Sequence, residues 1–472
     1  MTRIPTTAGR PGRRRELAEI LGLALPLAAA QIATMLMNIT DSVMLGHLSS
    51  DALAAGGLGA NVAFIFIMLM LGVQAGMPPL IAQARGAGDH APIGRAVWGG
   101  VIAGAVAAPP IMLVLLRIDG LLRLIGEPEA ITQSVLVYER AFIWSIPASA
   151  LVGVMRNFLS AMERPRVTML VAFAGVALNL LMNWVLIYGH LGLPAFGIAG
   201  SGYATSISWS FMALALVGYI ARARLLPRDF WSMGWAARWE GLAAVFKLGW
   251  PIAGIYLVEV GLFSASSLLA AKFGAVAAAA HQICLNVSAL TFMVPLAISQ
   301  SATVRVGFHM GAGAVQRAWL AGLLALGMGV GFMACMAIVL AFGRHLVFAL
   351  YLDSADPDYA AVLDLGMTLL AIACVYQVFD GAQVVAAGAL RGIKDTRVPM
   401  LMGAVGYWGL GMTIGASLAF GFGWGPAGLW WGFVVGLATM STLLSLRFRA
   451  LMGRYLAVQT RHHLAGALPE QG

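Results

Sequence analysis

The chain is 472 residues long, and 60% of its residues are hydrophobic whereas only 10% are charged. Soluble domains carry about 25% charged residues, so this composition excludes an ordinary soluble protein and indicates a multi-pass membrane protein. A net charge of +9 would suggest a nucleic-acid partner in a soluble chain, but here the lysines and arginines are confined to short loops. We therefore expect contact with the lipid bilayer and no nucleic-acid partner.

Apolar runs long enough to cross a bilayer, which takes roughly 20 residues, follow one another along the chain. Two uncharged runs, 167–221 and 398–446, each hold two helices, because clusters of helix-breaking residues divide them at Gly189–Pro194 and Gly421–Pro426. The sequence thus predicts an all-α membrane protein with twelve transmembrane helices. The other eight are expected at 20–47, 52–84, 96–116, 131–155, 248–271, 273–304, 318–343 and 365–390.

The basic residues are divided unequally between the two sides of the membrane. With twelve helices both termini lie on one side, and the alternating loops place 24 of the 29 lysines and arginines on that side. Loops that face the cytoplasm carry an excess of basic residues, so both termini are predicted to be cytoplasmic. The first apolar run is too long for a signal peptide and is interpreted as a retained membrane helix.

The two halves of the chain repeat each other. Each half holds six helices, an even number, so both halves cross the membrane in the same sense, as in transporters built from two bundles about an axis along the membrane normal. We predict an N-terminal six-helix bundle at 1–230 and a C-terminal six-helix bundle with a cytoplasmic tail at 231–472. A shift of 225 residues aligns Pro26 with Pro251, Asn61 with Asn286, Leu71 with Leu296, Gly86 with Gly311 and Gly88 with Gly313.

Three carboxylates interrupt the predicted membrane helices: Asp41, Glu259 and Asp380. A charge at the bilayer centre costs roughly 3 kcal/mol or more, so such groups are rare and usually face a cavity or a partner. Two carboxylates that lie close together in a low-dielectric cavity cannot both stay ionised without a cation, and so they share a proton or bind Na⁺. These residues indicate a protein that moves ions or handles cations.

Two stretches resemble the multidrug and toxic compound extrusion (MATE) family, specifically its bacterial NorM-type branch. Asp41–Leu48 (DSVMLGHL) is similar to the first-helix signature of that family, and Tyr376–Pro399 is similar to its tenth helix and the loop that follows. Pro251–Phe273, Asn179–Trp184 and Gly197–Thr205 agree as well, so the resemblance covers nearly the whole chain. It implies the MATE fold, two bundles related by pseudo-two-fold symmetry, in the bacterial inner membrane.

The resemblance implies a cation-coupling site in the second bundle, made by Glu259, Asp380 and Tyr376. Tyr376 and Asp380 are four residues apart, which places both on one face of a helix. If the coupling ion is Na⁺, Glu259 and Asp380 are its expected ligands. No organic cofactor is expected, and the coupling ion is Na⁺ or H⁺.

The first bundle is expected to bind substrate or a proton through Asp41, Asn179, Asn183 and Thr205. Some relatives place a second carboxylate where Asn183 stands, so we expect only one titratable group in this bundle, which favours protonation or drug contact at Asp41 over a tight Na⁺ site. Isolated asparagines in membrane helices also serve as interhelical hydrogen-bond partners. Pro26, on the same helix as Asp41, is a candidate hinge, although a static kink is the commoner reason for a mid-helix proline.

These features favour a secondary active antiporter, not an enzyme, that exports organic cations such as drugs and dyes in exchange for inward Na⁺ or H⁺. We expect it to act as a monomer. A flippase for a lipid-linked intermediate or an exporter of an endogenous metabolite is the alternative, but a pyrophosphate cavity would need arginines and lysines, and the membrane cores are predicted to hold none. An intramembrane enzyme is the remaining alternative, and the sequence has no motif for one.

Overall fold

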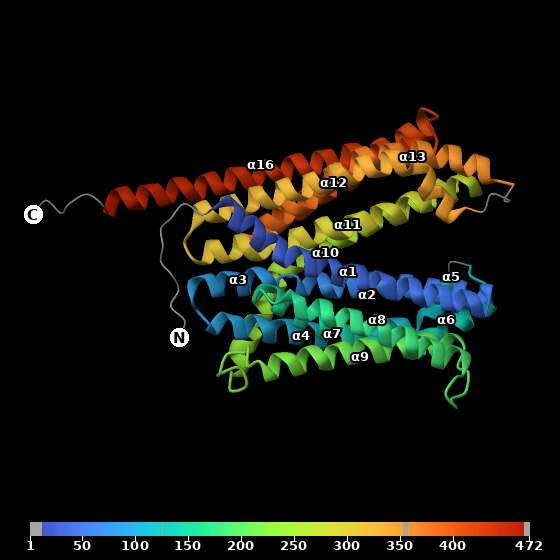
Figure 1. The fold of residues 1–472 in the computed structure, drawn as a ribbon, viewed down its shortest axis with the longest axis horizontal. Coiled ribbons are helices and arrows are strands. Elements are labelled where there is room, and N and C mark those ends of the chain that lie inside the picture. The colour runs from blue at the N-terminus through green and yellow to red at the C-terminus, as the bar shows by residue number, and fades with distance from the viewer. Residues whose placement is uncertain (1–11, 125, 353–356, 467–472) are drawn as a thin grey trace, which may run out of the picture.

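The computed structural model describes residues 12–124, 126–352 and 357–466, and in this part of the chain helices are joined by short turns (Figure 1). Within these described residues, eleven helices are long and apolar enough to cross a membrane, and one bent pair of helices completes the predicted twelve. The helices are α1 (Arg13–Leu48), α2 (Ser50–Gln74), α3 (Met77–Ala87), α4 (Ala91–Leu116), α5 (Ile118–Leu124), α6 (Glu129–Phe142), α7 (Ser145–Ala161), α8 (Pro165–Tyr188), α9 (Ile198–Arg222), α10 (Trp235–Ala271), α11 (Ala275–Gly311), α12 (Val315–Tyr351), α13 (Tyr359–Gly392), α14 (Arg397–Gly403), η1 (Ala404–Met412), α15 (Thr413–Ala416), η2 (Ser417–Gly421) and α16 (Pro426–Gly466).

The helix predicted at 131–155 is a bent pair, α6 and α7, whose axes differ by 51°. Pro147 lies in the first turn of α7, where it cannot donate a backbone hydrogen bond and its ring crowds the carbonyl group of Ile143. The bend therefore falls at Ile143 and Trp144. Pro26 does not interrupt the chain in this way, because α1 continues through it to Leu48.

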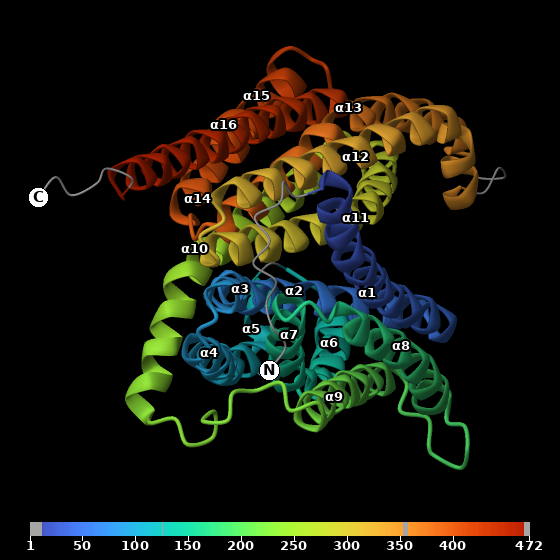
Figure 2. The same ribbon diagram turned by 60° about the vertical axis from the view of Figure 1, so that its left-hand side comes forward.

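The helices form two bundles that lie one above the other in Figure 1, with α1–α9 in one and α10–α16 in the other. The predicted boundary at residue 230 falls in the segment between α9 and α10. Helix α10 packs on α4 and α2 of the N-terminal bundle at Gly241 and Gly249, and it contacts α14 and η1 further along, at Gly254 and Gly261. Figure 2 shows the first part of α10 beside α4 and α3. We call the end of the molecule that holds the start of α1 and the end of α16 the terminal end.

A symmetric contact joins the bundles at the terminal end and reflects the internal repeat. A Cβ atom on Gly86 of α3 would lie 2.0 Å from the carbonyl oxygen of Phe308 in α11, and one on Gly311 would lie 1.9 Å from that of Gln83. The two contacts are related by the 225-residue shift found in the sequence. Only glycine permits such a close approach of two helix backbones. Gly88 and Gly313, which follow, both have left-handed φ angles, of 72° and 70°.

Candidate functional site

Asp41 lies in a polar cluster inside the N-terminal bundle, formed by α1, α8 and α9. Asn183 donates a hydrogen bond to Asp41 Oδ1 and also contacts Asn179 Oδ1 at 3.1 Å, while Thr205 Oγ1 donates to Asp41 Oδ2 at 2.9 Å. Asn179, Asn183 and Thr205 are buried. The structure thus brings together all four residues that the sequence proposed for this bundle, and three neutral donors and acceptors surround one carboxylate.

A pocket lies in the same bundle, on the side of Asp41 that faces the terminal end. Thr34, Ala172 and Trp209 line it, and Arg156 is its one charged residue. Thr34 precedes Asp41 by seven residues on α1, and Ala172 precedes Asn179 by seven on α8, so pocket and carboxylate share the same helix faces. Because seven helical residues rise by about 10 Å, the pocket is expected to lie about 10 Å from the Asp41 carboxylate along the helix axes.

The prediction that the membrane cores contain no arginine is therefore wrong. Arg156 lies inside α7, half-buried, and donates a hydrogen bond of 3.3 Å to Gln31 Oε1 of α1. The sequence pattern suggested a loop position, because Arg164 and Arg166 follow closely. The additional positive charge makes the N-terminal pocket less favourable for a simple cation than its single carboxylate suggested.

The second acidic site lies in the C-terminal bundle, between α10, α13 and η1. Asp380 and Glu259 lie close enough to interact electrostatically, as does the hydroxyl group of the buried Tyr407. Gln383 Nε2 approaches Asp380 Oδ1 at 3.4 Å. Among the described residues, neither carboxylate forms a salt bridge with a lysine or arginine, and no cluster of three or more histidine, cysteine, aspartate or glutamate side chains surrounds them.

Tyr376 belongs to an aromatic wall beside this pair. Its ring packs edge-on against Trp430 and Phe433, with centroids 5.6 and 6.1 Å away. Trp430 Nε1 donates a hydrogen bond of 3.0 Å to His281 Nδ1, so the proton of the neutral imidazole lies on Nε2, which faces Ser267 Oγ at 3.3 Å. Tyr376 thus packs against a tryptophan that is itself fixed by the buried His281.

Sequence reasoning missed Tyr407, Gln383 and His281. Tyr407 lies in η1, a π-helical stretch, and such widened turns occur frequently at functional sites. Its signal in the sequence is weak, because a tyrosine among glycines and aromatic residues is common in membrane helices. Gln383 had a usable signal, since it lies three residues after Asp380 and therefore on the same helix face.

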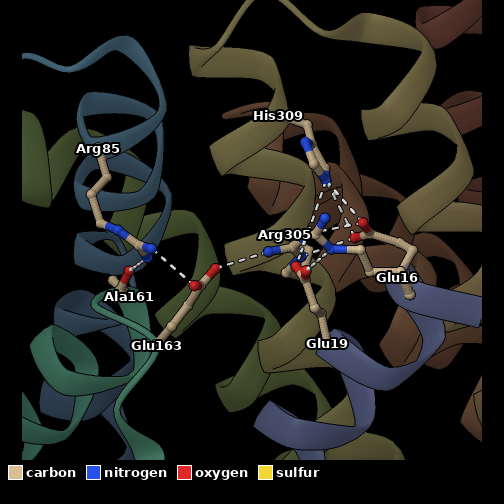
Figure 3. Close-up of polar contacts among 8 residues, drawn as sticks. Glu16, Glu19, Arg85, Ala161, Glu163, Arg305 and His309 are labelled. Carbon is tan, nitrogen blue, oxygen red and sulfur yellow. Dashed lines mark hydrogen bonds and ion pairs between the residues drawn. The ribbon is translucent and has the colours of Figure 1, made fainter. Parts of the chain in front are cut away.

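A network of ionic contacts joins the two bundles at the terminal end (Figure 3). Arg305 of α11 makes two parallel hydrogen bonds to Glu16 of α1, at 2.9 and 2.8 Å, and also contacts Glu19. Its remaining nitrogen reaches Glu163, between α7 and α8, at 3.0 Å. Glu163 in turn accepts a hydrogen bond of 2.9 Å from Arg85 of α3. We call Glu16, Glu19, Arg85, Glu163 and Arg305 the ionic latch.

The charges of the latch favour its closed form. Burial alone would raise the pKa of Glu163, but the neighbouring Arg85 and Arg305 guanidinium groups outweigh this effect and hold the pKa below its ordinary value. Glu163 is therefore ionised at neutral pH. A charge-assisted, two-pronged arginine–carboxylate contact is among the stronger hydrogen-bonded pairs, so the network holds the bundles together at this end.

Comparison with known sequences places the chain in one family throughout. The MatE family model matches residues 26–185 and 251–416, one match in each bundle. The multidrug resistance protein NorM of Burkholderia vietnamiensis is 41% identical over 94% of this chain and 96% of its own length. The probable multidrug resistance protein NorM of Burkholderia pseudomallei is 42% identical over 93% of each chain.

Solved structures share the fold at low sequence identity. The eukaryotic MATE transporter AtDTX14 superimposes with a TM-score of 0.84 at 19% identity, and the match covers 95% of this chain and 99% of the other. A mutant of the Vibrio cholerae MATE transporter VcmN gives a TM-score of 0.84 at 18% identity, with coverage of 94% and 99%. The two-bundle architecture predicted from the sequence is that of these transporters.

Proposed function

The chain belongs to the MATE family of multidrug transporters, and from this premise we propose that it exports organic cations in exchange for inward Na⁺ or H⁺ by alternating access. The observation that carries the proposal is the pair Glu259 and Asp380, two carboxylates in a membrane bundle that form no salt bridge among the described residues, where the nearest basic influence is an electrostatic interaction of Arg391 with Glu259. Such a pair holds less than two negative charges unless a cation joins it. An exchangeable cation is therefore its natural counter-charge.

Alternating access requires that the ends of the protein open in turn. The ionic latch and the glycine contacts hold the terminal end closed, while α1 diverges from the C-terminal bundle toward the opposite end (Figures 1 and 2). With cytoplasmic termini, this arrangement corresponds to a conformation closed toward the cytoplasm. Substrate and coupling cation compete for the carboxylates, so a coupling cation that arrives from the outer side releases the substrate there.

Simple energetics limit the stoichiometry. Moving one charge across 100 mV is worth about 2.3 kcal/mol, and one pH unit is worth about 1.4 kcal/mol. Exchange of one H⁺ for one monovalent cation is electroneutral and draws only on the pH gradient. Steep accumulation therefore requires more than one coupling ion for each substrate, or a Na⁺ gradient.

The test is efflux of a fluorescent organic cation from membrane vesicles under Na⁺ and pH gradients imposed separately. We expect one of the gradients to drive efflux, and we expect Asp380→Asn and Glu259→Gln to abolish it. The matched control is Asp364→Asn, an exposed carboxylate of the same helix α13, which should transport normally. Gradient-driven efflux that persists in both site variants would contradict the proposal.

A lipid-linked substrate is less well supported by the same residues. A pyrophosphate group carries several negative charges and needs several basic partners. The pocket in the N-terminal bundle offers Arg156 alone. This single charge does, however, suit a substrate that carries a separate acidic group, and the efflux assay can include such zwitterions.

A further inference from the structure

A fourth carboxylate, Glu139, lies inside the membrane region of the N-terminal bundle. It lies on α6, ten residues after the start of the helix, and its side chain is 0% exposed. Neither of its carboxylate oxygens has a hydrogen-bond partner among the described residues. This arrangement differs from that of Asp41, whose two oxygens are both occupied. The expectation of a single titratable group in this bundle is therefore wrong.

The neighbours of Glu139 provide no counter-charge. A Cβ atom on Gly59 of α2 would lie 3.0 Å from Glu139 Oε1, so the backbone of α2 closes over the carboxylate. Arg140 is next in sequence but exposed, because adjacent helical residues point in different directions. An ionised carboxylate buried in this way without a partner is strongly destabilised. The titratable and charged groups of α6 and of the helices packed on it are Asp51 (α2), Arg95 (α4), Asp119 and Arg123 (α5), Glu129, Tyr138 and Arg140 (α6), and Tyr203, Tyr219 and Arg222 (α9).

Most of these groups are too far along their helices to neutralise Glu139. Arg123 forms a salt bridge with Glu129 at the start of α6, and Arg95 and Arg222 lie near the terminal-end tips of α4 and α9. The group that remains nearby is Tyr138, a neutral phenol that lies within electrostatic reach of both Glu139 and Asp41. No fixed base in the described part of the chain therefore holds Glu139 in its ionised form.

Helix α9 connects Glu139 to the Asp41 cluster. A Cβ atom on Gly202 would lie 2.8 Å from the carbonyl oxygen of Tyr138, so α9 packs directly on α6 beside Glu139. Thr205, one turn further along α9, donates the hydrogen bond to Asp41. Glu139 and Asp41 thus lie on two sides of the same turn of α9, the turn from Gly202 to Thr205.

We propose that Glu139 is a second proton-exchanging acid of the N-terminal bundle, protonated when Asp41 is neutral and able to release its proton when a cationic substrate occupies the bundle. The proposal rests on the proposed function. In the step itself the O–H bond of the Glu139 carboxyl group breaks, the proton passes to water and the carboxylate gains one negative charge. A proton suits this site better than Na⁺, which needs several oxygen ligands, because the described surroundings of Glu139 provide none within hydrogen-bond distance.

The test counts protons released when tetraphenylphosphonium binds to the purified full-length protein. Titration calorimetry in buffers of different ionisation enthalpy gives that number at each pH. We expect Glu139→Gln to lower the maximum number by about one and to flatten the dependence of affinity on pH to the same extent. Glu129→Gln, an exposed carboxylate on the same helix, is the matched control and should match the wild type.

Two outcomes would overturn the proposal. The first is an unchanged proton number in Glu139→Gln together with its complete loss in Asp41→Asn. The second outcome applies if Glu139→Gln does not fold, and it uses infrared difference spectra recorded on ligand binding. The proposal is overturned if the wild-type protein loses the protonated carboxyl signal of one group only, and if the position of that signal is the same in Glu139→Asp. Failure of the proposed function would appear separately, as gradient-driven efflux that survives both Asp380→Asn and Glu259→Gln.

Discussion

The four carboxylates inside the membrane region differ in the number of hydrogen-bond partners that each one has. Asp41 accepts hydrogen bonds at both oxygens, Asp380 has one long contact from Gln383, and Glu259 and Glu139 have none among the described residues. A carboxylate with donors tolerates ionisation, whereas one without donors favours a proton or a bound cation. The Asp41 cluster is therefore suited to hold a negative charge, as the proposed export of cations requires.

We expect Thr205→Val to weaken the binding of tetraphenylphosphonium. The substitution keeps the shape of the side chain but removes the hydroxyl group that donates to Asp41 Oδ2. The loss of one such bond is worth about 1 kcal/mol, which corresponds to about fivefold weaker binding at neutral pH. Thr205→Ser keeps the donor and is the control. Equal affinity in the valine variant and the wild type would show that Asp41 does not rely on this contact.

The second prediction at this scale concerns stability. Trp430→Phe removes the donor to His281 Nδ1 and leaves a buried nitrogen without a partner. Such a loss costs roughly 1–3 kcal/mol, so thermal unfolding in detergent should begin at a lower temperature. Trp424→Phe, at an exposed position, provides the control. An unchanged melting temperature for Trp430→Phe would mean that water replaces the lost donor.

At this scale the sequence was sufficient for some residues and not for others. Asp41, Glu259 and Asp380 could be predicted because each stands alone in a long apolar run. Glu139 could not, because it precedes Arg140 and follows other charged residues, and the pattern resembles the end of a helix. The direction in which it points depends on the packing of α2 and α9, which one sequence does not reveal.

At the scale of the helices, close packing is achieved by glycine. Gly86 and Gly311 let α3 and α11 approach until backbone touches backbone. The repeat in the sequence predicted that these positions are equivalent, but their mutual contact became evident only in the structure. Likewise, glycine and proline clusters marked the turns at 189–194 and 421–426, whereas the bend before Pro147 was not foreseen.

We expect Gly86→Ala to favour opening of the terminal end. The new methyl group would lie 2.0 Å from a carbonyl oxygen of α11, so the two helices must separate. Electron resonance distances between spin labels on the two bundles should lengthen at that end. Gly331→Ala, where no atom lies within 4 Å, should leave the distances unchanged and is the control. Identical distances in Gly86→Ala and the wild type would contradict this interpretation of the interface.

The pocket formed by α1, α7, α8 and α9 leads to a prediction about substrate charge. Arg156 repels a cation at Asp41 by on the order of 1 kcal/mol at an effective dielectric constant of about 20. Arg156→Gln should therefore strengthen the binding of a simple organic cation by up to about tenfold. Arg164→Gln, at the exposed end of the bundle, is the control. Weaker binding in Arg156→Gln would assign the arginine a purely structural role.

At the scale of the whole molecule, the ionic latch connects residues far apart in the chain, since Glu16 and Arg305 are 289 positions apart. The two bundles could be predicted from the repeat, but this contact could not, because any of several basic residues could have paired with Glu16. It also shows that Arg305 belongs to the interior of the terminal end and not to a loop.

The latch should respond to acid. Because the pKa of Glu163 is lowered in the folded protein, its contribution to closure is fully present above its unfolded pKa of about 4.3 and is lost as the pH falls through the lower folded value. At neutral pH, Glu163→Gln should destabilise the closed terminal end relative to the open one by roughly 1.5–3 kcal/mol. In strong acid, where Glu163 is protonated, the substitution should change this free energy little. Spin-label distances across the terminal end measure this effect.

The control for the latch is Glu240→Gln. Glu240 pairs with Arg95 across the same interface, but both side chains are exposed, and such pairs contribute little. The spin-label distances across the terminal end should be the same in Glu240→Gln as in the wild type at every pH. Should both variants open the terminal end equally, overall charge rather than the buried network would be responsible.

The length of α16 has a practical consequence. Its 41 residues extend over about 60 Å, roughly twice the thickness of the hydrocarbon layer, and Figure 1 shows it projecting beyond its neighbours. Gln459 ties this projection to the carbonyl oxygen of Gly313, in the turn between α11 and α12. A fluorescent protein fused after α16 would move together with the C-terminal bundle. Energy transfer from it to a dye on the N-terminal bundle would then report the relative movement of the two bundles in living cells.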